Sequence, residues 1–216
     1  MLCLNSLPAE RARGCRFAEK FESPTAVAKN RGTVVGAVPI LPGKGADFPG
    51  TVGNHITYPC GSILNKSALS VVIDFIPNFA ADDGNNKFWF DSTGTERSLL
   101  FKSNTNAISL HLGNATLVLS SSIATYGPYW NDFQRNTLVC CGLSTGANYM
   151  YLNGQLIDSS ATAWTPHDPT TIYVGCRFSG IYVFDGHITN FKIFTGNVAA
   201  DLLTAQEAKD YYLRGA

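Results

Sequence analysis

The chain has 216 residues and a mass of 23.3 kDa, enough for one large domain whose core needs no disulfide support. Sixteen Lys and Arg residues balance sixteen Asp and Glu residues, and no apolar run reaches the ~18 residues of a membrane span, so we expect neither a nucleic-acid partner nor a span. The 20 Gly residues and 12% aromatic residues favour many short strands with tight turns over a helix bundle.

Residues 1–31 show little hydrophobic period before Phe17 and carry much of the chain's positive charge. No secretory signal is visible, because Pro8 interrupts the first apolar run; the compartment stays open, with a virion or a cell surface among the candidates. We expect this segment to be a docking arm outside the core, apart from a strand around residues 17–21. Its contacts with a partner chain would use Leu2, Leu4, Leu7, Arg11 and Arg13.

From Gly32 onward the chain alternates strand-like runs with clusters of Gly, Pro, Asn and Ser, the spacing typical of a sandwich or barrel. No composition break marks a linker, so residues 32–216 are expected to form a single β-sandwich domain. The predicted strands are 33–38, 55–58, 69–76, 87–90, 98–103, 107–112, 116–123, 137–143, 148–152, 155–159, 171–176 and 187–194.

Three local signals in the C-terminal part predict specific geometry. Asn153-Gly154 between apolar runs predicts a hairpin with a type I′ turn, because both residues tolerate a positive φ. The apolar alternation of the last strand slips near Asn190, which predicts a β-bulge. Thr204-Ala-Gln-Glu207 matches a capping box and predicts a short C-terminal helix.

The six cysteines lack the paired C-x-x-C spacing of a zinc site, so we interpret most of them as reduced packing residues. Cys140 and Cys141 are neighbours in a predicted strand. Their side chains must therefore point to opposite faces of the sheet.

The order of the C-terminal motifs resembles the concanavalin A-like, laminin G-like jelly-roll family. Those motifs are Tyr-Leu-Asn153-Gly154, Thr171-Ile-Tyr-Val-Gly175, Phe184-Asp-Gly186-His-Ile, and the final Leu203-Thr-Ala-Gln-Glu207. The resemblance covers roughly residues 16–214 and implies an all-β fold, a two-sheet antiparallel β-sandwich (jelly roll) with a short C-terminal helix. Many members carry a Trp-His pair where this chain has Arg135-Asn136. The family hosts lectins, adhesins, hydrolases and capsid parts, so the function has to be argued from a site.

No catalytic residues are predicted. The five Glu residues never form the alternating acids that glycoside hydrolases of this superfamily use, and no Gly-x-Ser-x-Gly or catalytic Cys signature occurs. The sequence therefore predicts that the protein is not an enzyme and needs no cofactor.

Calcium is the one metal considered, because it prefers carboxylate and amide oxygens. Asp82, Asp83 and Asn85 lie in the loop that is richest in oxygen ligands. The same residue types also favour an ordinary turn, which is the alternative interpretation.

Two loops have the composition of a sugar site, which pairs an aromatic plane with polar groups for the hydroxyls. One loop holds Tyr126, Tyr129, Trp130 and Asp132, and the other holds Trp164 and His167. The alternative is that these aromatic side chains pack in the sandwich or contact another protein.

Two functions remain open on these grounds. The first is a non-enzymatic recognition or assembly module, a structural or surface-displayed component of a larger assembly such as a phage or virus particle. The alternative is a carbohydrate-binding lectin or adhesin that uses the aromatic loops. Partners would be other protein chains in a homo- or hetero-oligomer, or a glycan.

Overall fold

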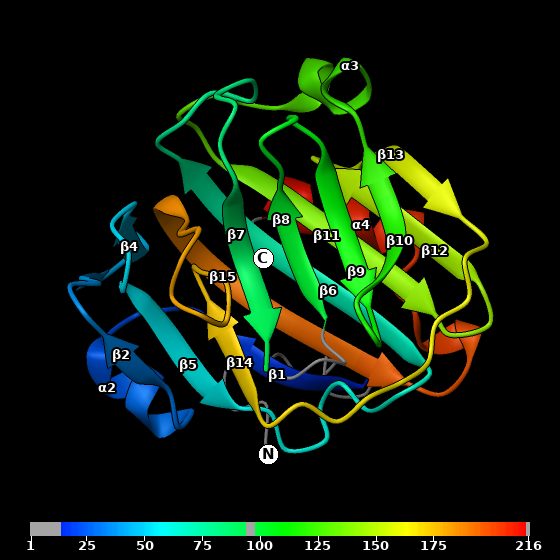
Figure 1. Ribbon diagram of the computed structural model, residues 1–216, viewed down its shortest axis with the longest axis horizontal. Helices are drawn as coiled ribbons and strands as arrows, with labels where there is room; N and C mark the ends of the chain where they lie inside the picture. The colour runs from blue at the N-terminus through cyan, green and yellow to red at the C-terminus, as the bar shows by residue number, and fades with distance from the viewer. Residues whose placement is uncertain (1–13, 94–97, 215–216) are drawn as a thin grey trace.

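The computed structural model describes residues 14–93 and 98–214, and in this part of the chain two antiparallel sheets stack as a β-sandwich (Figure 1). The eight-stranded sheet has the order β13 (Gln155–Ser160), β12 (Ala147–Leu152), β11 (Asn136–Leu143), β6 (Ala68–Pro77), β15 (Asp185–Gly196), β4 (Gly45–Pro49) and β3 (Ile40–Leu41), and β1 (Cys15–Glu19) also pairs with β15. The seven-stranded sheet has the order β10 (Thr116–Ser121), β9 (Ile108–Leu112), β8 (Leu99–Lys102), β7 (Lys87–Ser92), β14 (Thr171–Val174), β5 (His55–Pro59) and β2 (Thr33–Val35). The predicted two-sheet sandwich is confirmed.

The main core lies between the two sheets and is rich in aromatic rings. Phe75 on β6 has its ring centroid 5.1 Å from that of Trp89 on β7 and 5.9 Å from that of Phe184. These edge-on contacts join the middle strands of both sheets, where burial of apolar area stabilises the fold most.

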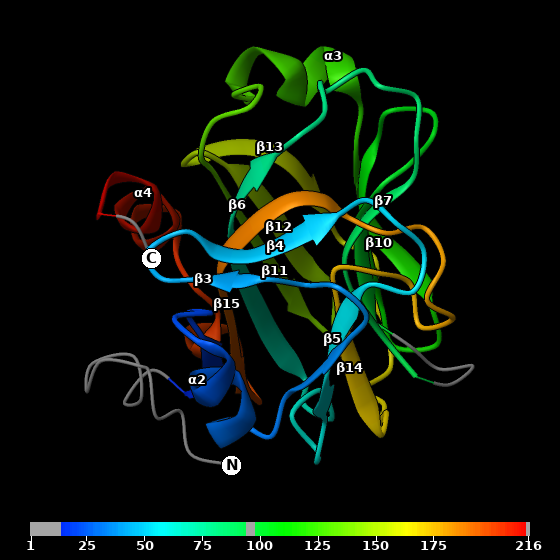
Figure 2. The ribbon, with the colours of Figure 1, turned by 90° about the vertical axis from the view of Figure 1, so that its left-hand side faces the viewer.

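A second apolar cluster lies on the outer face of the eight-stranded sheet. The 3₁₀ helix η2 (Ala199–Asp201) and the C-terminal helix α4 (Ala205–Arg214) cover this face, as Figure 2 shows. Cys141 belongs to this outer cluster, whereas Cys140 belongs to the core between the sheets. The prediction that these side chains face opposite ways is confirmed, and the cysteines of the described part are free thiols.

The three local signals also agree with the structure. Asn153 and Gly154 have φ values of 51° and 78° in the turn between β12 and β13. The pairing of β15 with β6 shifts between Ile188 and Asn190. At the start of α4, Thr204 N donates to Glu207 Oε2 at 2.8 Å, and Glu207 N donates to Thr204 Oγ1 at 3.2 Å.

The N-terminal segment agrees with the prediction in forming a strand near residues 17–21, and it differs in that helix α2 (Pro24–Lys29) also joins the core. β1 supplies Phe17, and α2 supplies Val27, to the core between the sheets. Ser23 caps α2 by accepting a hydrogen bond from Ala26 N, with Pro24 at the first helical position. The sandwich therefore includes residues 14–31. The predicted assembly residues Leu2, Leu4, Leu7, Arg11 and Arg13 lie outside the described residues.

The predicted strand at residues 116–123 is shorter in the structure. β10 ends at Ser121, and helix α3 (Ile123–Tyr126) and the 3₁₀ helix η1 (Gly127–Tyr129) follow.

None of the helices in the described ranges is both long and apolar enough to cross a bilayer.

Candidate functional site

The structure brings two of the predicted loops together at one rim of the sandwich. Ala81, in the loop between β6 and β7, accepts a hydrogen bond from Tyr126 Oη at 3.1 Å. Its backbone N–H donates to Asp132 Oδ1 at 3.1 Å. The loop predicted to bind calcium and the first loop predicted to bind sugar are therefore in direct contact.

Most aromatic rings of this rim face the core. Tyr126 is fully buried, and Trp130 is 8% exposed with its ring centroid 5.4 Å from that of Phe75. Neither ring offers the exposed plane expected from the sequence, because each one fills the space between the sheets. Tyr129, in contrast to Tyr126, is 40% exposed to solvent.

The second predicted sugar loop lies at the opposite end of the sandwich. Trp164 N donates to Ser144 O at 3.0 Å, in the turn between β11 and β12. Tyr129 O instead accepts from Asn153 Nδ2 at 2.7 Å, in the turn at the other end of β12. Trp164 and His167 are both buried. The structure thus keeps the two loops apart and places Trp164 in packing, the alternative interpretation.

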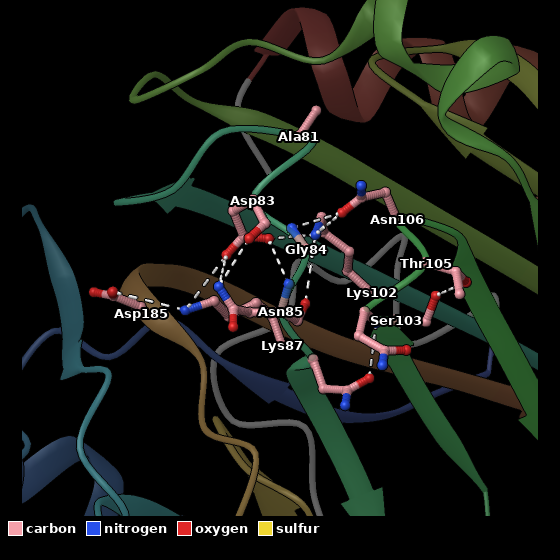
Figure 3. Close-up of polar contacts among 12 residues, drawn as sticks. Ala81, Asp83, Gly84, Asn85, Lys87, Lys102, Ser103, Thr105, Asn106 and Asp185 are labelled. Atoms are coloured by element: carbon pink, nitrogen blue, oxygen red, sulfur yellow. Dashed lines mark hydrogen bonds and ion pairs between the residues drawn. The ribbon is translucent and has the colours of Figure 1, made fainter.

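Lysine side chains engage the acidic loop of the rim (Figure 3). Lys102 Nζ contacts Asp83 Oδ1 and donates to Asn106 Oδ1 at 2.8 Å, although the Lys102 side chain is fully buried. Lys87 Nζ lies 3.8 Å from both Asp83 Oδ2 and Asp185 Oδ2. The Asp83 carboxylate therefore faces two ammonium groups.

A calcium ion would need the Asp83 carboxylate oxygens as ligands. In the structure these oxygens form ion pairs with Lys102 and Lys87. Within residues 14–93 and 98–214 no group of three His, Cys, Asp or Glu side chains could hold a metal ion. Calcium binding at Asp82, Asp83 and Asn85 stays a prediction, and it requires the ammonium group of Lys102 to move away from Asp83.

Glu19, the last residue of β1, is fully buried, and its contacts are structural. Its carboxylate accepts from Asn30 Nδ2 at 2.9 Å, from Phe21 N at 3.0 Å and from Tyr58 Oη at 3.3 Å. Burial, followed by the charge of Glu19 and the hydrogen bond to it, raises the pKa of the Tyr58 phenol well above its usual value.

The absence of enzymatic activity stays a prediction.

A surface that the sequence analysis missed lies on the outer face of the seven-stranded sheet. We call it the aromatic face, and it consists of His55, Phe88, Phe101, His111, Tyr173 and Tyr182. Their strand neighbours Trp89, Leu100, Leu110 and Ile172 belong to the core between the sheets, so alternate residues point outward. Among the described residues no helix lies over this face (Figure 1).

The rings of the aromatic face run from strand to strand. Phe88 stacks on Phe101 with centroids 4.7 Å apart and planes 10° apart, and it stacks on Tyr182 at 6.0 Å and 20°. His111 continues the row at 5.6 Å from Phe101, and His55 lies 5.5 Å from Tyr173. The rings thus form two groups on the same outer face, His55 with Tyr173 and Phe88 with Phe101, His111 and Tyr182, and Phe88 at the centre of the second group is itself buried.

Polar groups border this row. The Arg177 guanidinium lies over the Tyr182 ring at 5.7 Å. Burial lowers the pKa of His55, against a smaller opposing effect of a backbone hydrogen bond to Gly53, and so favours the neutral imidazole. Aromatic planes beside such groups are the chemistry that holds sugar rings.

The aromatic face escaped the sequence analysis because the signal spans strands that are far apart along the chain. The run Lys87-Phe-Trp-Phe90 is apolar on both faces, and the pairing of β7 with β8 shifts between Phe88 and Phe90. Only the strand pairing reveals that Phe88 points outward beside Phe101.

No model of a known protein family and no curated protein matches this sequence. Solved structures do resemble it. Domain 4 of AbnA, an extracellular GH43 arabinanase of Geobacillus stearothermophilus in complex with arabinotriose, is 16% identical with a TM-score of 0.55, over 83% of this chain and 86% of that domain. Botulinum neurotoxin type C, whose cell entry depends on two ganglioside molecules, is 13% identical with a TM-score of 0.65, over 95% of this chain and 52% of the toxin chain.

The sialidase of Trypanosoma rangeli, in complex with a difluoro sugar acid, is 16% identical with a TM-score of 0.57, over 83% of this chain. This chain spans 28% of the sialidase and about half of the toxin chain. At such identities the similarity establishes the fold, a two-sheet β-sandwich, and leaves the function to be argued from the chain's own residues.

Proposed function

We propose that this chain is a non-enzymatic carbohydrate-binding module that holds its ligand on the aromatic face. The observation that carries the proposal is the row of stacked rings on an outer sheet face that no described helix covers. Sugar rings present apolar C–H faces, which stack on aromatic planes, and their hydroxyls need donors and acceptors beside the ring.

The structural neighbours support a sugar ligand in general terms. The arabinanase domain was solved with arabinotriose, and the toxin depends on gangliosides. Transfer of this property to the present chain is part of the proposal, because the identities are 16% and 13%. Membership of the concanavalin A-like, laminin G-like family is proposed on the C-terminal motifs together with the sandwich fold.

In this proposal Tyr173 and Tyr182 contact the sugar ring. Tyr182 is 43% exposed, its ring stacks on Phe88, and the Arg177 guanidinium lies 5.7 Å from the ring centroid. His55, beside Tyr173, and His111, beside Phe101, supply hydrogen bonds in this proposal. The β14–β15 connection covers part of this face, because Phe178 N donates to Asp91, which pairs with Tyr173 and is fully buried, so we expect modest affinity.

Screening of the full chain on a glycan array, followed by titration calorimetry of the best ligand, tests the proposal. Tyr173→Ala and Tyr182→Ala should each raise the Kd at least about tenfold, because aromatic anchors dominate small interfaces. Tyr149→Ala is the matched control, since Tyr149 is 38% exposed on the other sheet.

Two outcomes would contradict the proposal. One is the absence of any glycan ligand. The other is loss of binding in Tyr129→Ala while both aromatic-face variants bind normally, which would place the site at the rim predicted from the sequence.

The other function predicted from the sequence, a structural component of a phage or virus particle, receives no support from the neighbours described above. Oligomeric assembly through Leu2, Leu4, Leu7, Arg11 and Arg13 stays a prediction, because these residues lie outside the described part of the chain.

A further inference from the structure

Three exposed apolar side chains gather where two loops meet beside the seven-stranded sheet. Val52 lies in the loop between β4 and β5, and Phe178 and Ile181 lie in the connection from β14 to β15. Their exposed fractions are 66%, 39% and 39%. We call these three residues the hydrophobic tip. Figure 2 shows the β14–β15 connection (orange) projecting on the side of the molecule opposite helix α4.

The backbone of the hydrophobic tip is held in place. Gly53 N donates to Gly180 O at 3.0 Å and joins the two loops, and Arg177 N donates to Ile181 O at 3.1 Å across the turn. Phe178 N donates at 3.1 Å to Oδ2 of Asp91, which is fully buried on β7. The fold therefore presents these apolar side chains outward on a braced turn, where exposed apolar groups mark interaction sites.

We propose that the hydrophobic tip inserts into the interfacial layer of an anionic lipid bilayer. Three side chains are too few for a stable protein interface, which takes roughly 20–30 residues on each side. A bilayer needs no shape complementarity, and apolar side chains on a projecting loop can enter its interfacial region.

The charge beside the hydrophobic tip fits the same partner. Arg177 is the one charged residue of the segments 51–54 and 177–182 and can meet lipid phosphate, whereas the Asp91 carboxylate that accepts from Phe178 N is fully buried. Tyr182 follows the tip directly, and tyrosine is enriched at the boundary between lipid and water. Because the chain's formal net charge is zero, the contact is expected to be weak, reversible and sensitive to salt.

Sedimentation of the full chain with sugar-free vesicles tests this inference. The probes are phosphatidylcholine vesicles with and without phosphatidylserine, at low and high salt. Wild-type protein should bind the vesicles that contain phosphatidylserine, and a Phe178→Ser, Ile181→Ser double variant should bind at least about tenfold more weakly. The matched control is Leu117→Ser, Leu156→Ser, whose leucines are 48% and 53% exposed on β10 and β13.

Undiminished binding by the tip variant, or no sedimentation of the wild type at low salt, would overturn the inference. Thermal unfolding of all variants confirms that they are folded. The vesicles carry no sugar, so this result is independent of the carbohydrate proposal, and the tip variant should keep any glycan affinity that the wild type has.

Discussion

At the scale of single residues, the buried contacts of Glu19 show how the N-terminal segment is held. A buried carboxylate is costly unless its oxygens accept hydrogen bonds, and Glu19 accepts from Asn30, Phe21 and Tyr58. Asn30 follows helix α2, and Tyr58 lies on β5 of the opposite sheet. One acid therefore links β1, α2 and the second sheet.

Replacement of Tyr58 with Phe should lower the free energy of unfolding by about 1–2 kcal/mol at pH 7, because Glu19 loses one donor. The pKa of Tyr58 is raised in the folded chain, so above its ordinary value of 10.0 the unfolded chain releases a proton that the folded chain keeps. Stability contributed by Tyr58 is thus present below pH 10 and lost as the pH rises further.

Urea unfolding between pH 7 and about pH 11 measures both effects. Tyr58→Phe should flatten the alkaline loss of stability, whereas Tyr149→Phe, which removes an exposed hydroxyl, should not. An alkaline slope equal to that of the wild type would show that the buried phenol does not contribute as argued.

At the scale of elements, the hairpin between β12 and β13 does more than reverse the chain. The Asn153 side chain donates to Tyr129 O at 2.7 Å and to Asn136 Oδ1 at 3.0 Å. Its Oδ1 accepts from Thr137 N at 2.8 Å. The turn therefore fixes the start of β11 and the position of the exposed Tyr129.

Gly154 packs against helix α4, which makes it more sensitive than other turn glycines. A Cβ there would lie 3.1 Å from Lys209 Cα, and φ is +78°. Gly43, between β3 and β4, has a similar φ of +72° but nothing within 4 Å. Gly43→Ala should destabilise by about 1–2 kcal/mol through the left-handed backbone alone.

Gly154→Ala should be at least about 1 kcal/mol worse than Gly43→Ala, because the new methyl group also crowds the helix. Chemical denaturation of the two variants side by side makes the comparison. Equal losses would mean that α4 shifts freely and is not braced by the hairpin.

At the scale of the whole molecule, a hydrogen bond joins the edge strands β10 and β13 of the two sheets, and the N-terminal strand β1 adds to the eight-stranded sheet. Ser120 N on β10 donates to Asp158 Oδ2 on β13 at 2.6 Å, which joins the edges of the two sheets. β1 pairs with β15 and brings the Phe17 ring to 4.8 Å from Tyr58 and 5.5 Å from Phe191.

Phe17→Ala should therefore destabilise the protein by about 3–5 kcal/mol, the usual loss for a phenylalanine in a core. Phe133→Ala is the control, because Phe133 is 62% exposed, and it should change stability by less than about 0.5 kcal/mol. Calorimetric unfolding compares the two. A neutral Phe17→Ala would contradict the placement of β1 in the core.

The sequence alone determined the features that depend on neighbouring residues. Asn153-Gly154, the Thr204–Glu207 capping box and the opposed Cys140 and Cys141 are settled by φ preferences and by the period of a strand. Most strand positions from Gly32 onward and the all-β class follow from the same local chemistry, whereas the short strands β3 and β4 were not predicted. Helix α2 also has a local signal, a capping Ser23 followed by Pro24 at the first helical position.

The tertiary structure decided which faces of those strands meet solvent and which distant residues meet one another. Trp130 and Trp164 are buried because strands far away in the sequence surround them, and composition cannot distinguish such rings from an exposed binding plane. Lys102 and Asp83 are 19 residues apart, yet they form an ion pair within the loop predicted to bind calcium. Phe88 and Tyr182 stack across nearly half of the chain, because pairing partners and strand register arise only when the two sheets close around a shared core.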